Sequence, residues 1–425
     1  MSEPTPRRLW PLGPLPLVLP AAEIAAAVLM GVWGMLTWPY QEWVRTSAEF
    51  HQQLAFAGPI AAASATYLAG RLTAPDRVFA LPVAPRAGRA TALRLLGLLG
   101  TSCTIGYLIG LIPLVAVTAS DAEHGAPHPL PVLTGVLGLW AAIAIGHLVG
   151  VLGRTALWAP LTCACAFAAV VAGTGGDELS ALLPVLHVSP IAGRVESTPF
   201  VVYRIAFFTV IAAASVVAAV AVSRLHRVGR RPLRALTPLL VPVLLAGPAL
   251  VSTPALFSLE RDAPRVCRVE RGVEHCVHAA HGSRLPIVER ATAAVLDAYG
   301  APADEVRRVY DEALRWDALV ADAEAGTPGA HADVVWVVVQ PASPTDHTGQ
   351  EVAALLSGLN ACPAGAGEGD RVDLAFALST WLQGGPTSDG PLARLTDDEL
   401  RAWITVNGER LGACALGVAD LPGEP

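Results

Sequence analysis

Residues 131–173 read PVLTGVLGLWAAIAIGHLVGVLGRTALWAPLTCACAFAAVVAG and decide the fold class, because they contain a single charged residue, Arg154. A membrane-spanning helix needs about 20 mostly apolar residues. As one helix, these 43 residues would extend about 65 Å, roughly twice the thickness of a bilayer core. The sequence therefore predicts two spans here, near 131–152 and 156–173, joined by a tight turn.

The remainder of the N-terminal part has the same apolar character. The chain is 53% hydrophobic and 15% charged, whereas soluble domains contain about 25% charged residues. Residues 1–257 therefore predict a mainly α, polytopic membrane bundle of about seven transmembrane helices. The predicted spans lie near 17–36, 54–70, 95–119, 131–152, 156–173, 201–222 and 235–257.

The first and last of these spans have alternative interpretations. Arg7 and Arg8 precede the first apolar run and also fit a cleaved signal peptide, but the run is long and contains Glu23. The last span contains four prolines, which membrane helices tolerate where neighbouring helices satisfy the freed carbonyls. Without this last span, the residues after 257 would be cytoplasmic.

The distribution of arginine predicts the orientation. With a cytoplasmic N-terminus, 13 arginines fall on the inner side, and only Arg45, Arg194 and Arg204 fall on the outer side. Such an excess of positive charge marks the cytoplasmic side of a membrane protein. We therefore expect a multi-pass protein of the plasma membrane whose residues 258–425 form an extracytoplasmic domain.

Charge and motifs exclude several functions. Residues 1–257 carry a net charge of +6 and residues 258–425 carry −13, so nucleic acid is not an expected partner of the acidic part. All 29 basic residues are arginine, and a phosphate-binding P-loop requires lysine. No GxGxxG, HExxH or GxSxG motif occurs either. The sequence therefore predicts no enzymatic activity and no cofactor of its own.

Residues 258–425 have the pattern of a small α+β domain. Helical spacing predicts helices over 285–300, 303–326, 349–362, 371–384 and 396–414. The last of these helices begins with a capping-box pair, Thr396 and Glu399. The β-branched run 332–340 predicts a strand.

Four cysteines of this domain predict disulfides in an oxidising compartment. Four cysteines allow three pairings. A two-residue turn at 271–272 would place Cys267 directly opposite Cys276 in a hairpin, within bridging distance. Cys362 and Cys414, each at the end of a predicted helix, would then form the second bond.

Three histidines near this hairpin offer an alternative. His275, His278 and His281 could bind a metal together with a reduced Cys276, but their spacing matches no zinc pattern. The disulfide is the favoured interpretation, so no metal site is predicted. Within the membrane, Glu23 and His147 are the candidate polar residues, either lining a path or packing between helices.

Three segments resemble the permease subunit of type-2 ABC exporters. They are FAGPIAAASATYLAGR at 56–71, the arginine-rich stretch 71–94, and LLPVLHVSPI at 182–191, which has the character of a re-entrant or interfacial segment. The layout is similar to permease-like membrane proteins of high-GC Gram-positive bacteria that add a last span and a cysteine-bearing outer domain. Cys267 and HCVHAAH at 275–281 contribute to this resemblance.

The resemblance implies that the chain forms a membrane path while a separate cytoplasmic ABC-type ATPase supplies energy. The segment that would dock on this ATPase carries Arg71, Arg77, Arg86, Arg89 and Arg94. The bilayer and a second permease subunit, identical or different, are further expected partners. The alternative function is a membrane-anchored extracytoplasmic binding or sensory module without transport activity.

Overall fold

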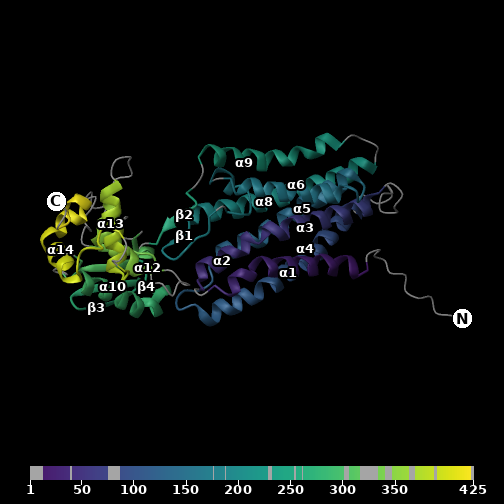
Figure 1. The fold of residues 1–425 in the computed structure, drawn as a ribbon. Coiled ribbons are helices and arrows are strands. Elements are labelled where there is room, and N and C mark those ends of the chain that lie inside the picture. The colour runs from purple at the N-terminus through teal and green to yellow at the C-terminus, as the bar shows by residue number, and fades with distance from the viewer. Residues whose placement is uncertain are drawn as a thin grey trace. The chain divides into compact units, whose positions relative to one another are not determined.

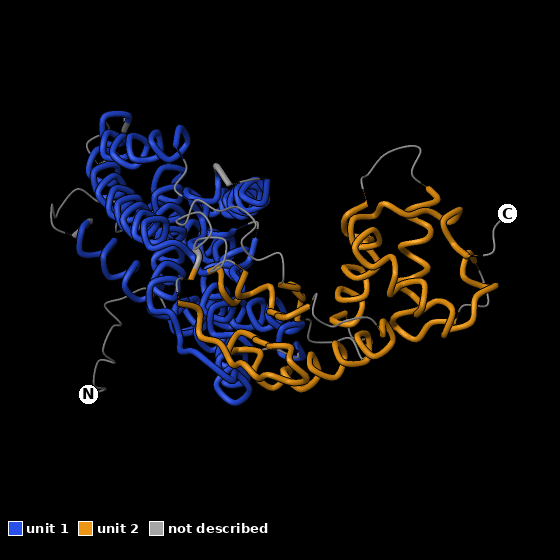
Figure 2. Tube along the Cα trace, turned by 90° about the vertical axis from the view of Figure 1, so that its left-hand side faces the viewer, with its two compact units in different colours: residues 1–191, 195–258 blue, residues 192–194, 259–425 orange. Residues whose placement is uncertain are grey.

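The computed structural model divides into two compact units (Figure 2). The N-terminal unit comprises residues 1–191 and 195–258, and the C-terminal unit comprises residues 192–194 and 259–425. The structure describes residues 13–38, 41–74, 87–175, 177–186, 188–227, 232–252, 255–260, 262–300, 306–315, 334–339, 347–362, 369–386 and 390–422.

Long apolar helices form the N-terminal unit and run along one common direction (Figure 1). The helices of this unit, long and short, are α1 (Leu15–Leu36), α2 (Trp43–Gln52), α3 (Leu54–Thr73), α4 (Ala87–Asp121), α5 (Pro129–Gly153), α6 (Trp158–Gly173), α7 (Asp177–Ser180), α8 (Thr198–Arg227), η2 (Pro232–Leu239) and α9 (Leu240–Val251). The short strands β1 (Arg194–Glu196) and β2 (Phe257–Leu259) pair with each other.

Five helical segments among the described residues are long and apolar enough to cross a membrane. They are α1, α4, α5, α8 and the segment Leu233–Val251, which covers η2 and α9. Helix α3 has the length of a span but includes polar residues such as Thr66 and Arg71, and α6 has only 16 residues. The structure thus shows a helical bundle of membrane type, whereas the seven predicted spans are not confirmed.

Close contact between backbones holds the bundle together. A methyl group added at Gly106 of α4 would overlap the Ala21 carbonyl of α1, and one added at Gly146 of α5 would overlap the Ala62 carbonyl of α3. Small residues that let helix backbones approach are typical of membrane helix interfaces, where lipid removes the hydrophobic driving force for association. The α1–α4 and α3–α5 pairs therefore depend on these glycines.

The predicted break between the fourth and fifth apolar runs is present. Helix α5 ends at Gly153, and Arg154 follows in a left-handed conformation with φ of 54°. Its backbone N–H donates to the Gly150 carbonyl, and its Nε donates to the Thr73 carbonyl at 3.2 Å. The C-terminal ends of α3 and α5 therefore lie together.

A mixed four-stranded sheet organises the C-terminal unit, with strand order β3-β4-β5-β6. Strands β3 and β4 form an antiparallel hairpin, while β5 pairs in parallel with β4 and with β6. The strands are β3 (Arg265–Glu270), β4 (Val273–His278), β5 (Arg308–Asp311) and β6 (Val334–Val337). The predicted strand at 332–340 is therefore confirmed at β6.

Helices cover the sheet and complete a separate hydrophobic core. This core joins Val277, Val309 and Val337 of the sheet to Val288 of α10 and Leu400 of α14. The helices are α10 (Leu285–Tyr299), α12 (His347–Leu356), α13 (Gly369–Leu382) and α14 (Asp397–Gly412), with the 3-10 turns η3 (Ala279–Arg284), η5 (Glu312–Leu314), η6 (Leu359–Ala361) and η7 (Val418–Asp420). Helix α14 begins with the predicted capping box of Thr396 and Glu399.

The helix predicted over 303–326 is wrong at residues 308–311, whereas residues 312–314 form the short 3-10 turn η5. Residues Arg308–Asp311 form β5 and alternate between half-buried and buried positions, which is the period of a strand. Parallel partners on both sides satisfy the backbone of β5 and override the local helical spacing. Residues 303–305 and 316–326 of this prediction lie outside the described part of the chain.

Candidate functional site

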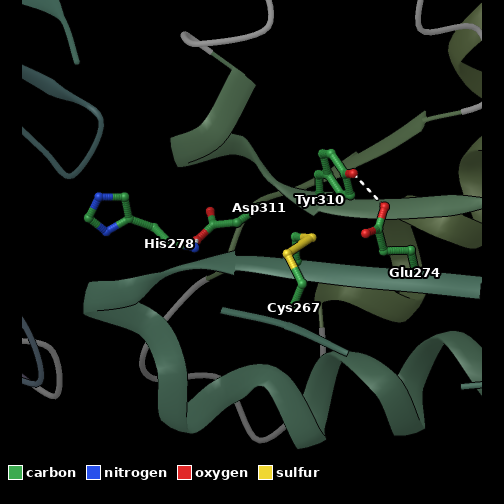
Figure 3. Close-up of a disulfide and its surroundings, with 6 residues drawn as sticks. Cys267, Glu274, His278, Tyr310 and Asp311 are labelled. Atoms are coloured by element: carbon green, nitrogen blue, oxygen red, sulfur yellow. Dashed lines mark hydrogen bonds between the residues drawn. A yellow bond between two sulfur atoms is a disulfide. The ribbon is translucent and has the colours of Figure 1, made fainter. Parts of the chain in front are cut away.

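The β3–β4 hairpin carries the first predicted disulfide. Cys267 and Cys276 are directly opposed in the ladder and are bonded to each other (Figure 3). Arg271 and Gly272 form the turn, with φ of 51° and 84°, as a two-residue hairpin turn requires. The second predicted bond joins Cys362 to Cys414. Both disulfides are therefore present, in the predicted pairing.

The three histidines near this hairpin do not meet at one point. His278 and His281 have ring centres 6.0 Å apart, and His281 Nδ1 lies 2.5 Å from Asp311 Oδ2. His275 instead follows the alternation of β4 and lies on the face that packs on α10. Within the described residues, the group of three metal-ligand types that does converge is Cys267, Glu274 and Cys276, whose two sulfurs are occupied by their disulfide.

The other predicted site residues are dispersed over the N-terminal unit. Glu23 is exposed on α1, and His147 is buried in α5 with neither ring nitrogen hydrogen-bonded to a described residue. In the candidate coupling segment, Arg71 lies in the last turn of α3, and Arg89 and Arg94 are exposed near the start of α4. Arg77 and Arg86 lie outside the described residues.

The structure reveals a buried polar cluster that sequence reasoning missed. His51 of α2 lies 2.6 Å from Glu196 of β1, and their side chains are 0% and 3% exposed. Gln53, which follows the last residue of α2, donates from Nε2 to Glu49 of that helix at 2.7 Å, and both residues are buried. Ion-pairing and hydrogen-bonding groups at this depth are costly unless they are mutually satisfied.

Arg204 links this cluster to the membrane helices. It lies in α8, is fully buried, and its Nη2 donates to the carbonyls of Leu183 at 2.9 Å and of Pro184. Its guanidinium also faces the rings of Phe200 and Phe208, 5.2 and 5.5 Å from their centres. An arginine held between backbone carbonyls and aromatic rings fixes the 183–184 segment to α8.

The surroundings of Glu196 favour the negatively charged form of its carboxyl. Burial raises the pKa of the Glu196 carboxyl, but His51, Arg204 and His128 outweigh burial, so this pKa lies below its ordinary value. Burial also raises the pKa of Glu49, and here the Gln53 hydrogen bond, His51 and Arg45 do not cancel it. The pKa values of the two carboxyls are therefore shifted in opposite directions, and Glu196 is the carboxyl whose ionised form this cluster favours.

An apolar groove adjoins this cluster inside the N-terminal unit. It has a volume of about 630 Å³ and is lined by α3, α5, α6, α8 and residues 182–184. Phe208, Leu183 and Pro184 belong to its wall and also contact Arg204. The groove therefore offers an apolar surface with a buried cationic group behind one end.

A further contact fixes the segment that closes this end. The side-chain amide of Gln52 donates to the Leu186 carbonyl at 3.1 Å and accepts from the Leu186 backbone N–H at 2.9 Å. Residues 183–186 of the apolar segment thus lie against α2 and α8. One sequence signal could have indicated this site, namely the polar run EFHQQ at 49–53 directly before an apolar helix.

Comparisons of the chain with sequence models of known families, with curated proteins and with solved structures give no match.

Proposed function

We propose that this chain is the permease-like membrane subunit of an ATP-driven exporter. The apolar groove between α3, α5, α6 and α8 carries the proposal, because it provides a binding surface inside a bundle of membrane-type helices. A groove lined almost entirely by apolar groups suits an apolar or amphipathic cargo. Arg204, behind the groove wall, would favour cargo with a negatively charged head.

Two features of the chain support an external energy source. The sequence contains no lysine and therefore no P-loop. His51 precedes the N-terminal end of α3, whereas Arg71 lies in the last turn at its C-terminal end. Arg154 lies beside this C-terminal end, where its Nε donates to the Thr73 carbonyl. We propose seven spans with these arginine-bearing ends in the cytoplasm, where an ATPase would dock, and with the C-terminal unit outside.

Extraction of the chain from its native membranes with a mild detergent tests the proposal. We expect an ATPase subunit to co-purify, and the substitution Arg89→Glu to release it, because reversing an exposed charge removes attraction at the docking surface. The matched control is Arg315→Glu, an exposed arginine of the C-terminal unit, which should leave the complex intact. A chain that purifies without any ATPase would refute the proposal.

Filling the groove tests the cargo site in the same complex. A side chain added at Gly58 would enter open space in the groove, so Gly58→Leu should reduce cargo-stimulated ATP hydrolysis several-fold without releasing the ATPase. Gly34→Leu is the control, because Gly34 of α1 also faces open space but does not line the groove. Equal ATP hydrolysis by both variants would show that the groove is not used.

The second candidate function is binding or sensing by the C-terminal unit. That unit has its own hydrophobic core and two disulfides, and residues 258–425 carry a net charge of −13. A chain that ends at residue 258 distinguishes the two functions. If it still assembles with the ATPase and supports its activity, the C-terminal unit serves binding and not transport.

A further inference from the structure

A small cavity of the C-terminal unit lies between β4 and α10 and has a volume of about 290 Å³. His275 reaches it from β4, and Glu289 and Thr292 reach it from α10. A spacing of three residues places Glu289 and Thr292 on one helix face. The exposed fractions are 3% for His275, 4% for Glu289 and 0% for Thr292. Three buried polar side chains from one strand and one helix therefore line part of the cavity.

The polar atoms of these three side chains are incompletely satisfied. Among the residues that the structure describes, no hydrogen-bond partner is found for Oε1 of Glu289, Oγ1 of Thr292 or either ring nitrogen of His275. The Val273 carbonyl lies close enough to favour a protonated ring but does not make a hydrogen bond of normal geometry with it. Buried polar groups in native proteins are nearly always paired, so this arrangement points to a bound group.

The charge around the cavity favours a cation. Its lining includes the carboxylates of Glu270, Glu289 and Asp297 but only one guanidinium, that of Arg271, which pairs with Asp297 at 2.8 Å. Arg268 donates to Oε2 of Glu289 at 3.0 Å from outside the lining and leaves Oε1 available.

The imidazole does not add positive charge near neutral pH. Burial lowers the pKa of His275, and the nearby carboxylates of Glu289 and Glu270 do not restore it. A neutral imidazole has one nitrogen that accepts a hydrogen bond. The cavity therefore presents three acceptors, namely the free oxygen of Glu289, the hydroxyl of Thr292 and one nitrogen of His275.

We propose that this cavity binds the primary ammonium group of a small organic amine. An ammonium group carries one positive charge and three N–H donors, which match a carboxylate and three acceptor atoms. A metal ion fits less well, because within the described residues no third histidine, cysteine, aspartate or glutamate converges with His275 and Glu289. The proposal concerns the C-terminal unit alone and does not depend on the exporter function.

Calorimetric titration of the full-length protein in detergent with propylammonium chloride tests the proposal. We expect saturable binding that weakens at least tenfold in Glu289→Gln, which removes the charge, and in Thr292→Val, which removes the hydroxyl. Thr292→Ser keeps the hydroxyl and should retain binding. Glu274→Gln is the control. Glu274 is the neighbour of His275 in β4, so its carboxylate lies on the opposite face of the sheet from the cavity, where it accepts a hydrogen bond from the Tyr310 hydroxyl (Figure 3).

Three results would overturn the proposal. The first is the absence of saturable binding by the unsubstituted protein. The second is equal binding of tetramethylammonium, which has the charge but no N–H donor. The third is tighter binding of zinc ions that is lost in His275→Asn, since this would identify a metal site. If Glu289→Gln does not fold, the difference in propylammonium binding between Thr292→Val and Thr292→Ser still tests whether the hydroxyl of residue 292 contributes to binding.

Discussion

At the scale of single residues, backbone conformation fixes the disulfide-bearing elements. Arg271 and Gly272 both adopt positive φ, and this turn sets the register that places Cys267 opposite Cys276. Gly358 has φ of 75° and lies against the Leu411 carbonyl of α14, near the second disulfide. At Gly358, a left-handed conformation and a close approach of two backbones are needed together.

Substitution of Gly358 tests this close approach. We expect Gly358→Ala to destabilise the C-terminal unit by about 2 kcal/mol or more. Alanine is strained at the positive φ of this position, and its methyl group would overlap the Leu411 carbonyl. Gly369→Ala is the matched control, since a methyl group there meets nothing within contact distance. Hydrogen exchange of α12 and α14 peptides in increasing urea measures the difference. Similar unfolding of both variants would contradict the packing described.

A second prediction at this scale concerns pH. Burial lowers the pKa of His275 in the folded protein, so the unfolded chain binds a proton more readily than the folded chain does. The free energy of unfolding of the C-terminal unit should therefore fall as pH drops below about 6.5, the ordinary histidine value. In His275→Asn this part of the pH dependence should disappear. Urea unfolding at several pH values measures it, and an unchanged slope in the variant would contradict the prediction.

The sequence predicts residue contacts only where they are local. The Cys267–Cys276 pair followed from a turn of two residues and the alternation of a hairpin. The His51–Glu196 pair joins residues 145 positions apart, and no local pattern indicates which distant carboxylate meets His51. Arg204 could be noticed as an arginine near an apolar run, but its carbonyl partners depend on how 183–184 folds back.

At the scale of elements, helices and strands with a clear local pattern are predicted well, but a short strand inside a segment of helical spacing is not. The capping box and apolar spacing of α14 are local signals, and the structure confirms both. Strand β5 has four residues within a segment of helical spacing, and its identity depends on pairing with β4 and β6. Tertiary pairing of this kind is invisible in a single sequence.

The two disulfides tie elements across chain separations of different length. Cys267–Cys276 closes a separation of 9 residues, and Cys362–Cys414 closes a separation of 52. By chain entropy, replacing the first pair with alanine should cost about 3 kcal/mol and replacing the second about 4 kcal/mol. Hydrogen exchange of the C-terminal unit during urea unfolding of the full-length protein gives both values. A larger loss from the short hairpin bond would contradict this order.

At the scale of the whole molecule, composition predicts the division into two units better than it predicts the number of spans. The apolar N-terminal part forms a bundle with five membrane-length helices, and the polar C-terminal part forms a separate α+β unit with disulfides. Helix α3 falls short by composition, and because most of its residues are buried among its neighbours, it does not need a fully apolar surface. Helix α6 falls short by length, with 16 residues.

The central claim is that the chain crosses the membrane with its disulfide-bearing unit outside. Single cysteines at two exposed positions, introduced by Val406→Cys in α14 and Leu157→Cys between α5 and α6, test it in a background where the free cysteines Cys103, Cys163 and Cys165 are alanine. A membrane-impermeant maleimide is applied to intact cells. We predict labelling of the first variant in intact cells, and of the second only after permeabilisation. Labelling of the Leu157→Cys variant alone in intact cells would contradict the account.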